Sequence, residues 1–322
     1  MSKILIIIPN FNGYKYSQKC LDALERQTFK DFQVCIVDDC STDDSYKRLI
    51  EYSLNSPLNI TVIKTPENRG PGFARKIAIE QLNSEWVAFC DIDDWYDDDF
   101  LETQYTHAIT TDSDLVMCDH WYVYGSGTRI IGGATQWAEN TIETKERVLA
   151  FSKMSLWRLL VKRELFKGVI FPEIYYGEDA PVTIQLIRNS KKTYVDRDAH
   201  YNYLIRQTSA SASAAGRSIK DYISAFDLIN KKIGDSYPAE CCFIGINMIL
   251  YGIVLLQCKN RVAETEIRET ISAFETSFSD WNQNKYLENL DTKKKVFLWL
   301  VKHRLIKLCA LYSKVHAFLL TR

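Results

Sequence analysis

The chain has 322 residues, of which 46% are hydrophobic and 25% are charged, which is typical of a folded protein and excludes a largely disordered one. This length predicts about two domains, or one domain with an appendage. The formal net charge of −1 at pH 7 excludes a protein that binds nucleic acid through a large overall positive charge, so no nucleic-acid partner is expected.

The cysteines and the N-terminus indicate a cellular compartment. Nine cysteines occur without the regular spacing of a metal site or a disulfide framework, so we expect most to be small buried hydrophobes in a reducing compartment. The apolar run "KILIIIP" at residues 3–9 is too short for a signal peptide. We therefore expect a cytoplasmic protein.

Buried-strand patterns alternate with helical patterns over residues 1–100. The expected strands cover 3–9, 32–39, 59–65 and 85–91, and the expected helices cover 16–28, 43–54 and 70–83. Continuous runs of β-branched residues are typical of parallel strands covered on both faces. The alternation predicts an α/β fold with a Rossmann-like, mostly parallel sheet flanked by helices.

The alternation weakens after about residue 100. Residues 113–131 have the pattern of strands around a Gly-Ser-Gly turn, residues 144–166 have a helical pattern, and another helix is expected over 180–189. From about residue 216 the pattern is nearly all helical. We therefore expect three regions, which are residues 1–100, residues 101–215 and a helical C-terminal region at residues 216–322.

Polar residues follow three of the expected strands at their carboxyl ends. These are Pro9 to Asn12, Asp38 with Asp39, and Asp91 to Asp93. In open α/β sheets, ligands bind beyond the carboxyl ends of the strands. The three segments should therefore line one crevice.

The acidic stretch "CDIDDWYDDD" suggests a metal site. If Asp91 and Asp93 continue the strand, their side chains point to the same face, and two carboxylates in a crevice suit a divalent cation that prefers oxygen ligands. The alternative is that these acids form a solvated turn or the start of a helix. We favour the metal for Asp91 and Asp93, and the solvated turn for residues 97–99.

Two further segments have the chemistry of a nucleotide site. Asp38 and Asp39 can accept hydrogen bonds from a base or a ribose, although Asp39 could instead cap the next helix or hold the following turn. In "NRGPGFARK", Gly70 and Gly72 leave the backbone accessible and Arg75 lies one turn into a helix. This combination can approach a diphosphate.

Together these motifs resemble the family-2 inverting glycosyltransferases, which have the GT-A fold. In that family a strand ending in P-x-[YF]-N precedes a helix ending in Q-T, and a VDD-x-S-x-D strand end, an N-x-G…AR segment and a D-x-D strand follow. The corresponding segments here are Pro9 to Asn12, Gln27-Thr28, Val37 to Asp43, Asn68 to Arg75, and Asp91 to Asp93. The match is dense over about the first 100 residues and fragmentary up to about residue 215.

The resemblance implies a nucleotide-sugar site that holds a UDP-sugar. Pro9 and Phe11 would pack around the base, and Asp39 would bond the uracil or its ribose. The residues expected to contact the nucleotide-sugar are Pro9, Phe11, Asn12, Asp38, Asp39, Asn68, Arg75, Asp91, Ile92 and Asp93. Asp93, with Asp91, would ligate Mn²⁺ or Mg²⁺ against the diphosphate.

The resemblance also implies a catalytic base in the step "YYGEDAPV". Asp179 is the candidate, with Glu178 beside it on the acceptor side; the alternative is that this pair caps the following helix. Trp95 and Tyr176, which neighbour the two acidic motifs, are expected to contact the acceptor. The stretch "YNYLIRQTSASAS" is similar to a later family segment, but it departs from the pattern before Arg206, which leaves a diphosphate contact for Arg206 in doubt.

The C-terminal tail has a pattern of its own. Residues 293–322 contain eight Lys or Arg and no acid, with leucines and aromatics at helical spacing. This pattern favours a helix in an anionic membrane interface, with a docked helix that has a solvated basic face as the alternative. Residues 243–258 are nearly all apolar but short, so we interpret them as a buried helix.

These observations predict an inverting glycosyltransferase. It would transfer a hexosyl residue from a UDP-sugar to a hydroxyl of a saccharide acceptor, expected to be lipid-linked and part of surface-polysaccharide or lipopolysaccharide synthesis, at the inner face of the cell membrane. The alternatives are transfer to a polyprenyl phosphate, a nucleotidyltransferase, and a catalytically inactive scaffold of the same fold. A nucleotidyltransferase would need a glycine-rich loop where "IPNFNG" stands, and no basic phosphate site is evident for the polyprenyl acceptor.

Overall fold

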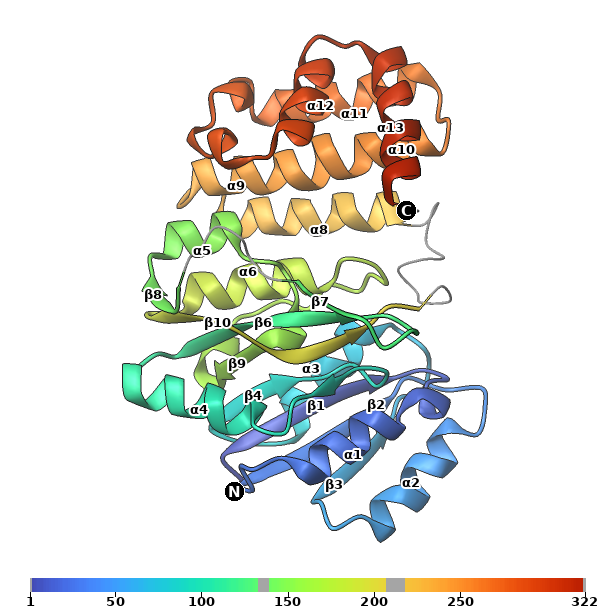
Figure 1. The fold of residues 1–322 in the computed structure, drawn as a ribbon, viewed down its shortest axis with the longest axis vertical. Helices are drawn as coiled ribbons and strands as arrows, with labels where there is room; N and C mark the ends of the chain where they lie inside the picture. Colours follow the sequence, from blue (N-terminus) through green and yellow to red (C-terminus); the bar gives the residue numbers. More distant parts are fainter. Residues whose placement is uncertain (1, 133–138, 207–217, 321–322) are drawn as a thin grey trace. The chain divides into compact units, whose positions relative to one another are not determined.

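The computed structural model describes residues 2–132, 139–206 and 218–320 (Figure 1). The chain divides into two compact units, Met1–Ala212 and Ser213–Arg322. The predicted division of the first unit near residue 100 stays a prediction. The two units are described separately below.

The first half of the first unit is a parallel sheet, as the sequence predicts. Its strands, in spatial order, are β3 (Ile60–Lys64), β2 (Phe32–Asp38), β1 (Ile4–Asn10) and β4 (Trp86–Phe89). The connecting helices are α1 (Gln18–Arg26), α2 (Ser45–Asn55) and α3 (Pro71–Gln81). Because crossovers are right-handed and the strand order reverses at β1, α1 and α2 lie on one face of the sheet and α3 on the other (Figure 1).

The second half of the first unit makes the sheet mixed. Strand β9 (Leu159–Lys162) lies antiparallel between β4 and β6 (Leu115–Val123), and β10 (Thr193–Leu204) runs parallel to β6. The short strands are β5 (Trp95–Tyr96), β7 (Arg129–Ile131) and β8 (Thr141–Glu143), and the helices are α4 (Phe100–Thr111), α5 (Lys145–Phe151) and α6 (Asp179–Asn189).

The prediction of one helix over residues 144–166 was wrong. Helix α5 ends at Phe151, and β9 begins at Leu159. Residues 159–161 are fully buried and pair with two strands. A short apolar run has the same sequence pattern in a buried helix and in a central strand. Whether it forms a strand is decided by the strands that pair with it, which are far away in the sequence.

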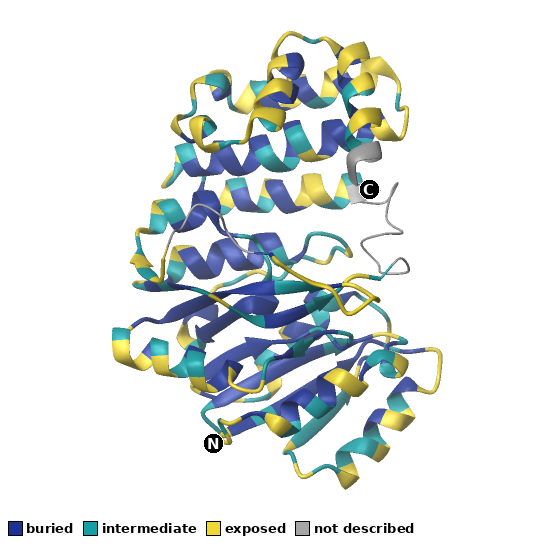
Figure 2. Cartoon of the chain, viewed as in Figure 1, coloured by how far each residue is buried: buried dark blue, intermediate teal, exposed yellow. Residues whose placement is uncertain are grey.

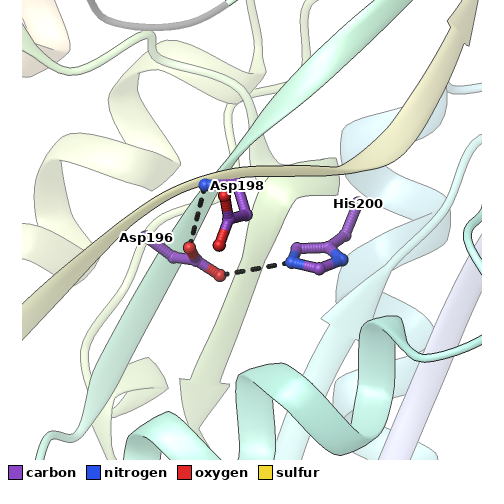
Figure 3. Close-up of side chains that lie close together, drawn as sticks. All are labelled: Asp196, Asp198 and His200. Carbon is purple, nitrogen blue, oxygen red and sulfur yellow. Dashed lines mark hydrogen bonds and ion pairs between the residues drawn. The ribbon is translucent and has the colours of Figure 1, made fainter. Parts of the chain in front are cut away.

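Strand β10 has an irregular register that brings polar side chains together. Its pairing with β6 shifts between Val195 and Ala199 and again between Ala199 and Tyr201. Such bulges redirect side chains. Asp196, Asp198 and His200 lie close together on this part of the strand (Figure 3).

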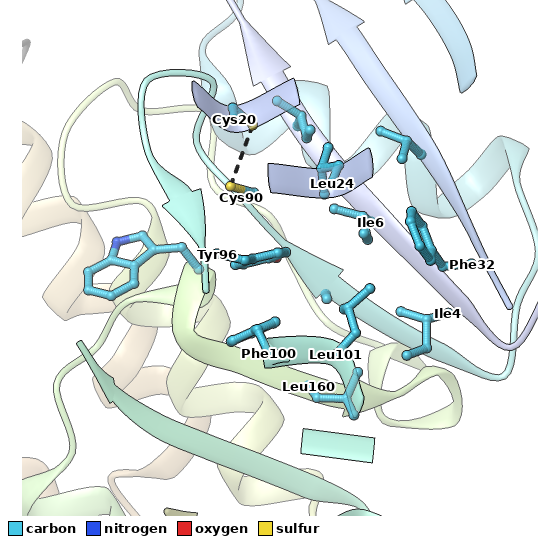
Figure 4. Close-up of a cluster of buried hydrophobic side chains, with 14 of the residues drawn as sticks. Ile4, Ile6, Cys20, Leu24, Phe32, Cys90, Tyr96, Phe100, Leu101 and Leu160 are labelled. Carbon is cyan, nitrogen blue, oxygen red and sulfur yellow. Dashed lines mark hydrogen bonds between the residues drawn. The ribbon is translucent and has the colours of Figure 1, made fainter. Parts of the chain in front are cut away.

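The core of the first unit lies against the sheet. The central strands are the most deeply buried part of the unit (Figure 2), and the rings of Tyr96 and Phe100 stack at 3.9 Å between centroids. Cys20 and Cys90 meet inside this cluster with their Sγ atoms 3.8 Å apart (Figure 4). Burial raises the pKa of the Cys90 thiol well above its usual range.

The second unit is helical where it is described. Its helices are α8 (Ser218–Ile233), α9 (Pro238–Gly245), a π-helical segment (Ile246–Ile253), α10 (Val254–Lys259), α11 (Glu264–Ser277), α12 (Thr292–Lys302) and α13 (Ile306–Leu320). One continuous stretch, Pro238–Lys259, is long and apolar enough to cross a membrane, judged by length and composition. Because 72% of its apolar window is buried inside the protein, it fits the expected buried helix.

Candidate active site

Arg75 is the centre of the candidate site. The helix that carries it begins at Pro71, and its side chain is almost fully buried. One guanidinium nitrogen, Nη1, donates to Glu178 Oε1 and to Asp179 Oδ1, each at 2.8 Å, and Nη2 donates to Asp91 Oδ1 at 2.9 Å. Three acidic side chains from two distant motifs therefore converge on one buried cation.

The charges around Arg75 are unbalanced, since three carboxyl groups share one guanidinium. Burial and, to a smaller extent, the charge of Asp179 raise the pKa of Glu178 to about 8, against the opposing effect of Arg75. Burial likewise raises the pKa of Asp91, against the attraction of Arg75. Glu178 therefore keeps its proton at neutral pH, which lowers the negative charge of the cluster.

Glu178 and Asp179 do not cap helix α6 with their side chains in the described structure. Glu178 occupies the N-cap position without a side-chain capping bond, and both carboxyls turn toward Arg75 instead. The second carboxylate oxygen of Asp179 accepts a hydrogen bond from the Leu156 amide at 3.3 Å, and 18% of its side chain stays exposed. Asp179 is thus held at both oxygens and still reaches solvent.

The premise that Asp91 and Asp93 continue a strand was wrong. Strand β4 ends at Phe89, and the Asp94 amide donates to the Asp91 carbonyl at 3.0 Å, which closes a turn. The two carboxylates consequently have different partners: Asp91 binds Arg75, and Asp93 binds the guanidinium of Arg206. Ile92, between them, is buried.

The pair formed by Asp93 and Arg206 is accessible to solvent. About a fifth of each side chain is exposed, and the guanidinium of Arg206 lies 4.0 Å from the centre of the Tyr16 ring. Arg206 is the last described residue before the gap at 207–217, so residues 207–213 of the family-like segment lie outside the described part of the chain. A positive charge thus already neutralises the carboxylate that we expected to bind a metal.

Asp94 is a buried carboxylate to which the sequence analysis gave no role. It accepts hydrogen bonds from the Tyr201 hydroxyl and from the Leu204 amide, both at 2.8 Å. The Tyr201 hydroxyl in turn accepts from the Asp91 amide at 3.2 Å. Asp94 therefore ties the acidic turn to β10, and only its place in the acidic stretch could have drawn attention to it.

The carboxylates of Asp38 and Asp39 are hydrogen-bonded within the protein. Asp38 is fully buried and accepts from Asn10 Nδ2 at 2.8 Å and from the Ser41 amide at 3.0 Å. Asp39 accepts from the Gly70 amide at 2.6 Å and from Thr65 Oγ1 at 3.0 Å. Asp38 thus has no surface for a ligand, and Asp39 fixes the loop that precedes α3.

Glycine is required at two positions beside these residues. Gly70 has a φ of 87°, in the left-handed region that side chains rarely adopt. A Cβ on Gly13 would lie 2.7 Å from both Asn10 Oδ1 and Ile92 Cγ2. The β1 loop and the acidic turn therefore pack directly against each other, which places two of the predicted motifs together.

The remaining predicted site residues lie at the end of β1 and in the loops before α3 and α6. Phe11 is half exposed, and Pro9 and Tyr176 are partly buried. Asn12 Oδ1 accepts from the Thr42 amide at 2.9 Å, so the Asn12 side chain holds the loop after β2. The Asn68 carbonyl accepts from the Tyr175 hydroxyl at 3.1 Å.

Trp95 lies on β5, which pairs with β10 beside the acidic turn. The ammonium of Lys19 lies 4.4 Å from the centre of its ring. Trp95 is partly exposed, so it has surface available near the acidic turn.

Comparisons with known proteins agree with this architecture. Residues 5–163 match the family model described as "Glycosyl transferase family 2". The glycosyltransferase GlyA of Streptococcus pneumoniae is 30% identical over 222 residues, which are 65% of this chain and 31% of that protein. The poly(ribitol-phosphate) beta-N-acetylglucosaminyltransferase TarS of Staphylococcus aureus is 27% identical over 72% of this chain and 41% of its own length.

Solved structures also resemble this chain. The structure of S. aureus TarS 1–349 superimposes with a TM-score of 0.72 at 21% identity and covers 98% of this chain and 91% of that one. A mannosyltransferase of Pyrobaculum calidifontis, solved with GDP-Man and Mn²⁺, gives a TM-score of 0.55 at 16% identity, over 98% of this chain and 87% of that one. At such identities the likeness concerns the fold.

The chain spans between about three tenths and two fifths of the length of the curated relatives described above. The match to part of these proteins therefore does not assign their activities to this chain. The family match over residues 5–163, together with the fold and the ordered motifs, shows that the chain contains a glycosyl transferase family 2 domain with the GT-A fold.

Proposed function

We propose that this chain transfers a hexosyl residue from a UDP-sugar to a hydroxyl of a saccharide acceptor, with inversion and with the assistance of a divalent metal. The observation that carries the proposal is the convergence of Asp91, Glu178 and Asp179 on Arg75. This convergence joins the acidic turn to the start of α6. Asp91, expected beside the donor, and Asp179, the proposed base, therefore bind the same guanidinium.

Inverting transfer is a single displacement. The acceptor oxygen forms a bond to the anomeric carbon while the bond to the diphosphate breaks, and UDP leaves with the electron pair. Asp179 accepts the proton of the acceptor hydroxyl, a contribution of roughly 10²–10⁴-fold for a positioned base. Arg75 and the Leu156 amide hold the Asp179 carboxylate in place, and the protonated Glu178 limits the repulsion around it.

The donor side has residues that fit a divalent cation. Asp91 and Asp93 offer carboxylate oxygens at partly exposed side chains, which is the ligand chemistry of Mn²⁺ and Mg²⁺. The guanidinium now bound to Asp93 supplies the positive charge that a cation would supply. When bound, a metal would neutralise charge on the leaving diphosphate, and Arg206 would be released to face the same group.

The relatives support the choice of donor and acceptor. TarS 1–349 has been solved in complex with UDP-GlcNAc and with UDP, and two relatives are named as transferases acting on poly(ribitol-phosphate). These names support a UDP-sugar donor and an acceptor that belongs to a bacterial surface polymer. Phe11, which is half exposed beside β1, is suited to stack on the uracil, and Trp95 and Tyr176 are the proposed acceptor contacts.

UDP binding tests the proposal. Calorimetry with and without Mn²⁺ should show metal-dependent binding for the intact protein and at least about tenfold weaker binding for Asp93→Ala. Asp98→Ala is the matched control, because Asp98 lies in the same acidic stretch but pairs with Arg26 at the surface. An intact protein that binds no UDP under either condition would refute the UDP assignment.

We further propose that the tail of the second unit lies on an anionic membrane surface, where a lipid-linked acceptor would be found. Helices α12 and α13 bury one side, including Phe297 and Val301, and expose apolar side chains on another. The exposed apolar residues are Val296, Trp299, Leu305, Leu308, Leu311 and Val315. The sequence from residue 292 to 322 contains eight Lys or Arg and no acid, as is typical of helices of the membrane interface.

Vesicle binding tests the membrane proposal. Each Lys near an anionic surface contributes about 1 kcal/mol, so the double change Lys302→Glu with Lys307→Glu should weaken binding to phosphatidylglycerol vesicles by at least about tenfold. Lys167→Glu with Lys191→Glu, two exposed lysines of the first unit, is the matched control. Equal binding by both double variants, or equal binding of the parent to neutral vesicles, would contradict the proposal.

A further inference from the structure

A cluster of histidine and aspartate side chains lies on the irregular part of β10, away from the Arg75 site. Asp196, Asp198 and His200 each offer one ligand atom, and these atoms lie within 4.8 Å of one another (Figure 3). Side chains of neighbouring strand residues point to opposite faces, and Tyr201 points to Asp94. Asp196 accepts from Gln104 of α4, and His200 Nε2 lies 3.6 Å from Asp196 Oδ2, so the cluster faces α4 and shares no residue with the acidic turn at 91–94.

Only one ring nitrogen of His200 has a hydrogen-bond partner among the described residues. His200 Nδ1 lies 3.2 Å from Asp99 Oδ1, so a proton on Nδ1 is donated to that carboxylate. His200 Nε2 is buried and makes no hydrogen bond to any described residue. Asp196 Oδ2 lies 3.6 Å from it.

Asp196 is oriented by its own partners. It is fully buried, and it accepts from Gln104 Nε2 at 2.9 Å and from the Asp198 amide at 2.9 Å. A second histidine approaches from α4, where His107 Nε2 lies 3.6 Å from the same oxygen, Asp196 Oδ2. A buried carboxylate needs compensation for its charge, and a cation bound between Asp196 and the two imidazoles would supply it.

The distances match those of a zinc site. With bonds of about 2.0–2.1 Å in a tetrahedron, two ligand atoms lie about 3.3–3.4 Å apart, close to both 3.6 Å separations at Asp196 Oδ2. Ligand histidines usually donate their other ring N–H to a carboxylate, and Asp99 Oδ1 lies 3.2 Å from Nδ1 of His200. Imidazole ligands favour zinc-like transition metals over Mg²⁺ or Ca²⁺.

We propose that Asp196, Asp198 and His200 bind one Zn²⁺ ion, with His107, whose Nε2 lies 3.6 Å from Asp196 Oδ2, as the fourth ligand. This site is separate from the nucleotide-sugar site. The ion joins β10 to α4 and, through His200 and Asp99, to the segment that follows the acidic turn. Its role is to fix β10 and this segment, both of which carry contacts of the acidic turn.

Zinc titration of the intact, tag-free protein tests the proposal. After removal of metals with a chelator, calorimetry with Zn²⁺ should show one ion bound per chain, with affinity lost by at least about a hundredfold in His200→Gln. Asp99→Asn removes only the orienting carboxylate, so a loss of about 10–100-fold is expected. His303→Gln is the matched control, because His303 is an exposed histidine of the second unit.

Asp93→Ala separates this site from the proposed metal site of the nucleotide-sugar, and it should bind Zn²⁺ as the parent does. Three outcomes would overturn the proposal: Zn²⁺ binding lost in Asp93→Ala, Zn²⁺ binding unchanged in His200→Gln, or no Zn²⁺ binding by the parent. The last outcome would mean that a shared proton joins these groups. If His200→Gln does not fold, judged by circular dichroism, Asp99→Asn decides, since its side chain is 57% exposed. Co²⁺ added to the parent should give the visible absorption of a four-coordinate ion, and a spectrum of hydrated Co²⁺ would count against the site.

Discussion

Two groups of carboxyl groups, at the end of β2 and around Arg75, differ in how their charges are balanced. At the end of β2, Asp38 and Asp39 accept hydrogen bonds from backbone amides, one side-chain amide and one hydroxyl. Around Arg75, three carboxyl groups share one guanidinium. The carboxylate oxygens of the first group all accept hydrogen bonds from donors within the protein. The second lacks positive charge, so a proton on Glu178 and, by our proposal, a metal beside Asp91 complete it.

The difference predicts which carboxylates serve stability and which serve chemistry. A carboxylate whose oxygens are all bonded to backbone donors stabilises the folded chain and has little capacity for a ligand. A carboxylate in an electrostatically unbalanced cluster is more often part of a functional site. Variants of single residues in each group can therefore break or sharpen the comparison.

The largest effect is expected for Asp179→Asn. The amide keeps the shape of the side chain but cannot accept the acceptor proton, so the transfer rate should fall by about 10²–10⁴-fold, while UDP binding and the free energy of unfolding change little. Transfer is measured as acceptor-dependent release of UDP. The control is Asp98→Asn, at an exposed pair with Arg26. A variant that keeps more than a tenth of the parent rate would remove Asp179 from the role of base.

A smaller effect, on stability, is expected for Asp39→Ala. The change leaves the Gly70 and Arg69 amides without their acceptor, and each lost bond to a charged group costs about 1.5–3 kcal/mol. The free energy of unfolding, measured by urea denaturation, should fall by about 2–4 kcal/mol. UDP binding should weaken too, because the loop before α3 is released.

Asp44→Ala is the matched control for Asp39→Ala. Asp44 lies in the loop that follows β2, makes no side-chain capping bond and is only 3.8 Å from Arg48 in an exposed pair. Its removal should change stability by less than about 0.5 kcal/mol. If Asp39→Ala were as stable as Asp44→Ala and lost only UDP binding, Asp39 would belong to the ligand site and the two groups of carboxylates would not differ as described.

The sequence predicted the first half of this architecture better than the second. Residues 1–100 form strands and helices that pair with near neighbours along the chain, so local periodicity and the order of motifs were sufficient to predict them. The family resemblance assigned Arg75, Asp91 and Asp179 to one site, but only the structure revealed that both carboxylates bind Arg75. Periodicity could not place β9, since its burial comes from strands far away in the sequence.

The side-chain partners in the second half of the first unit could not be predicted from the sequence for the same reason. Asp94 is buried because of Tyr201 and Leu204, more than a hundred residues later. Asp98 and Asp99 lie at the surface, as expected for residues 97–99, yet each has a partner, Arg26 and His200 respectively. A single sequence gives no signal for such pairs.

The finest test of the comparison is the pH dependence of stability at Glu178. Its folded-state pKa is raised to about 8 by burial and by Asp179, whereas an unfolded Glu titrates near about 4.3. Between these values the folded state holds a proton that the unfolded state releases, so this group makes the free energy of unfolding fall as pH rises through the window. One proton corresponds to a slope of about 1.4 kcal/mol per pH unit.

Glu178→Gln removes this titration while keeping a hydrogen-bonding side chain beside Arg75. Urea denaturation between about pH 5 and 8 should show a flatter fall in stability for the variant than for the parent, and the variant should be the more stable of the two above about pH 8. Asp39→Asn is a useful comparison, since its carboxylate has backbone donors instead of acidic neighbours. Parallel pH profiles for Glu178→Gln and the parent would show that Arg75 alone balances the cluster, and the contrast between the two groups of carboxylates would then be lost.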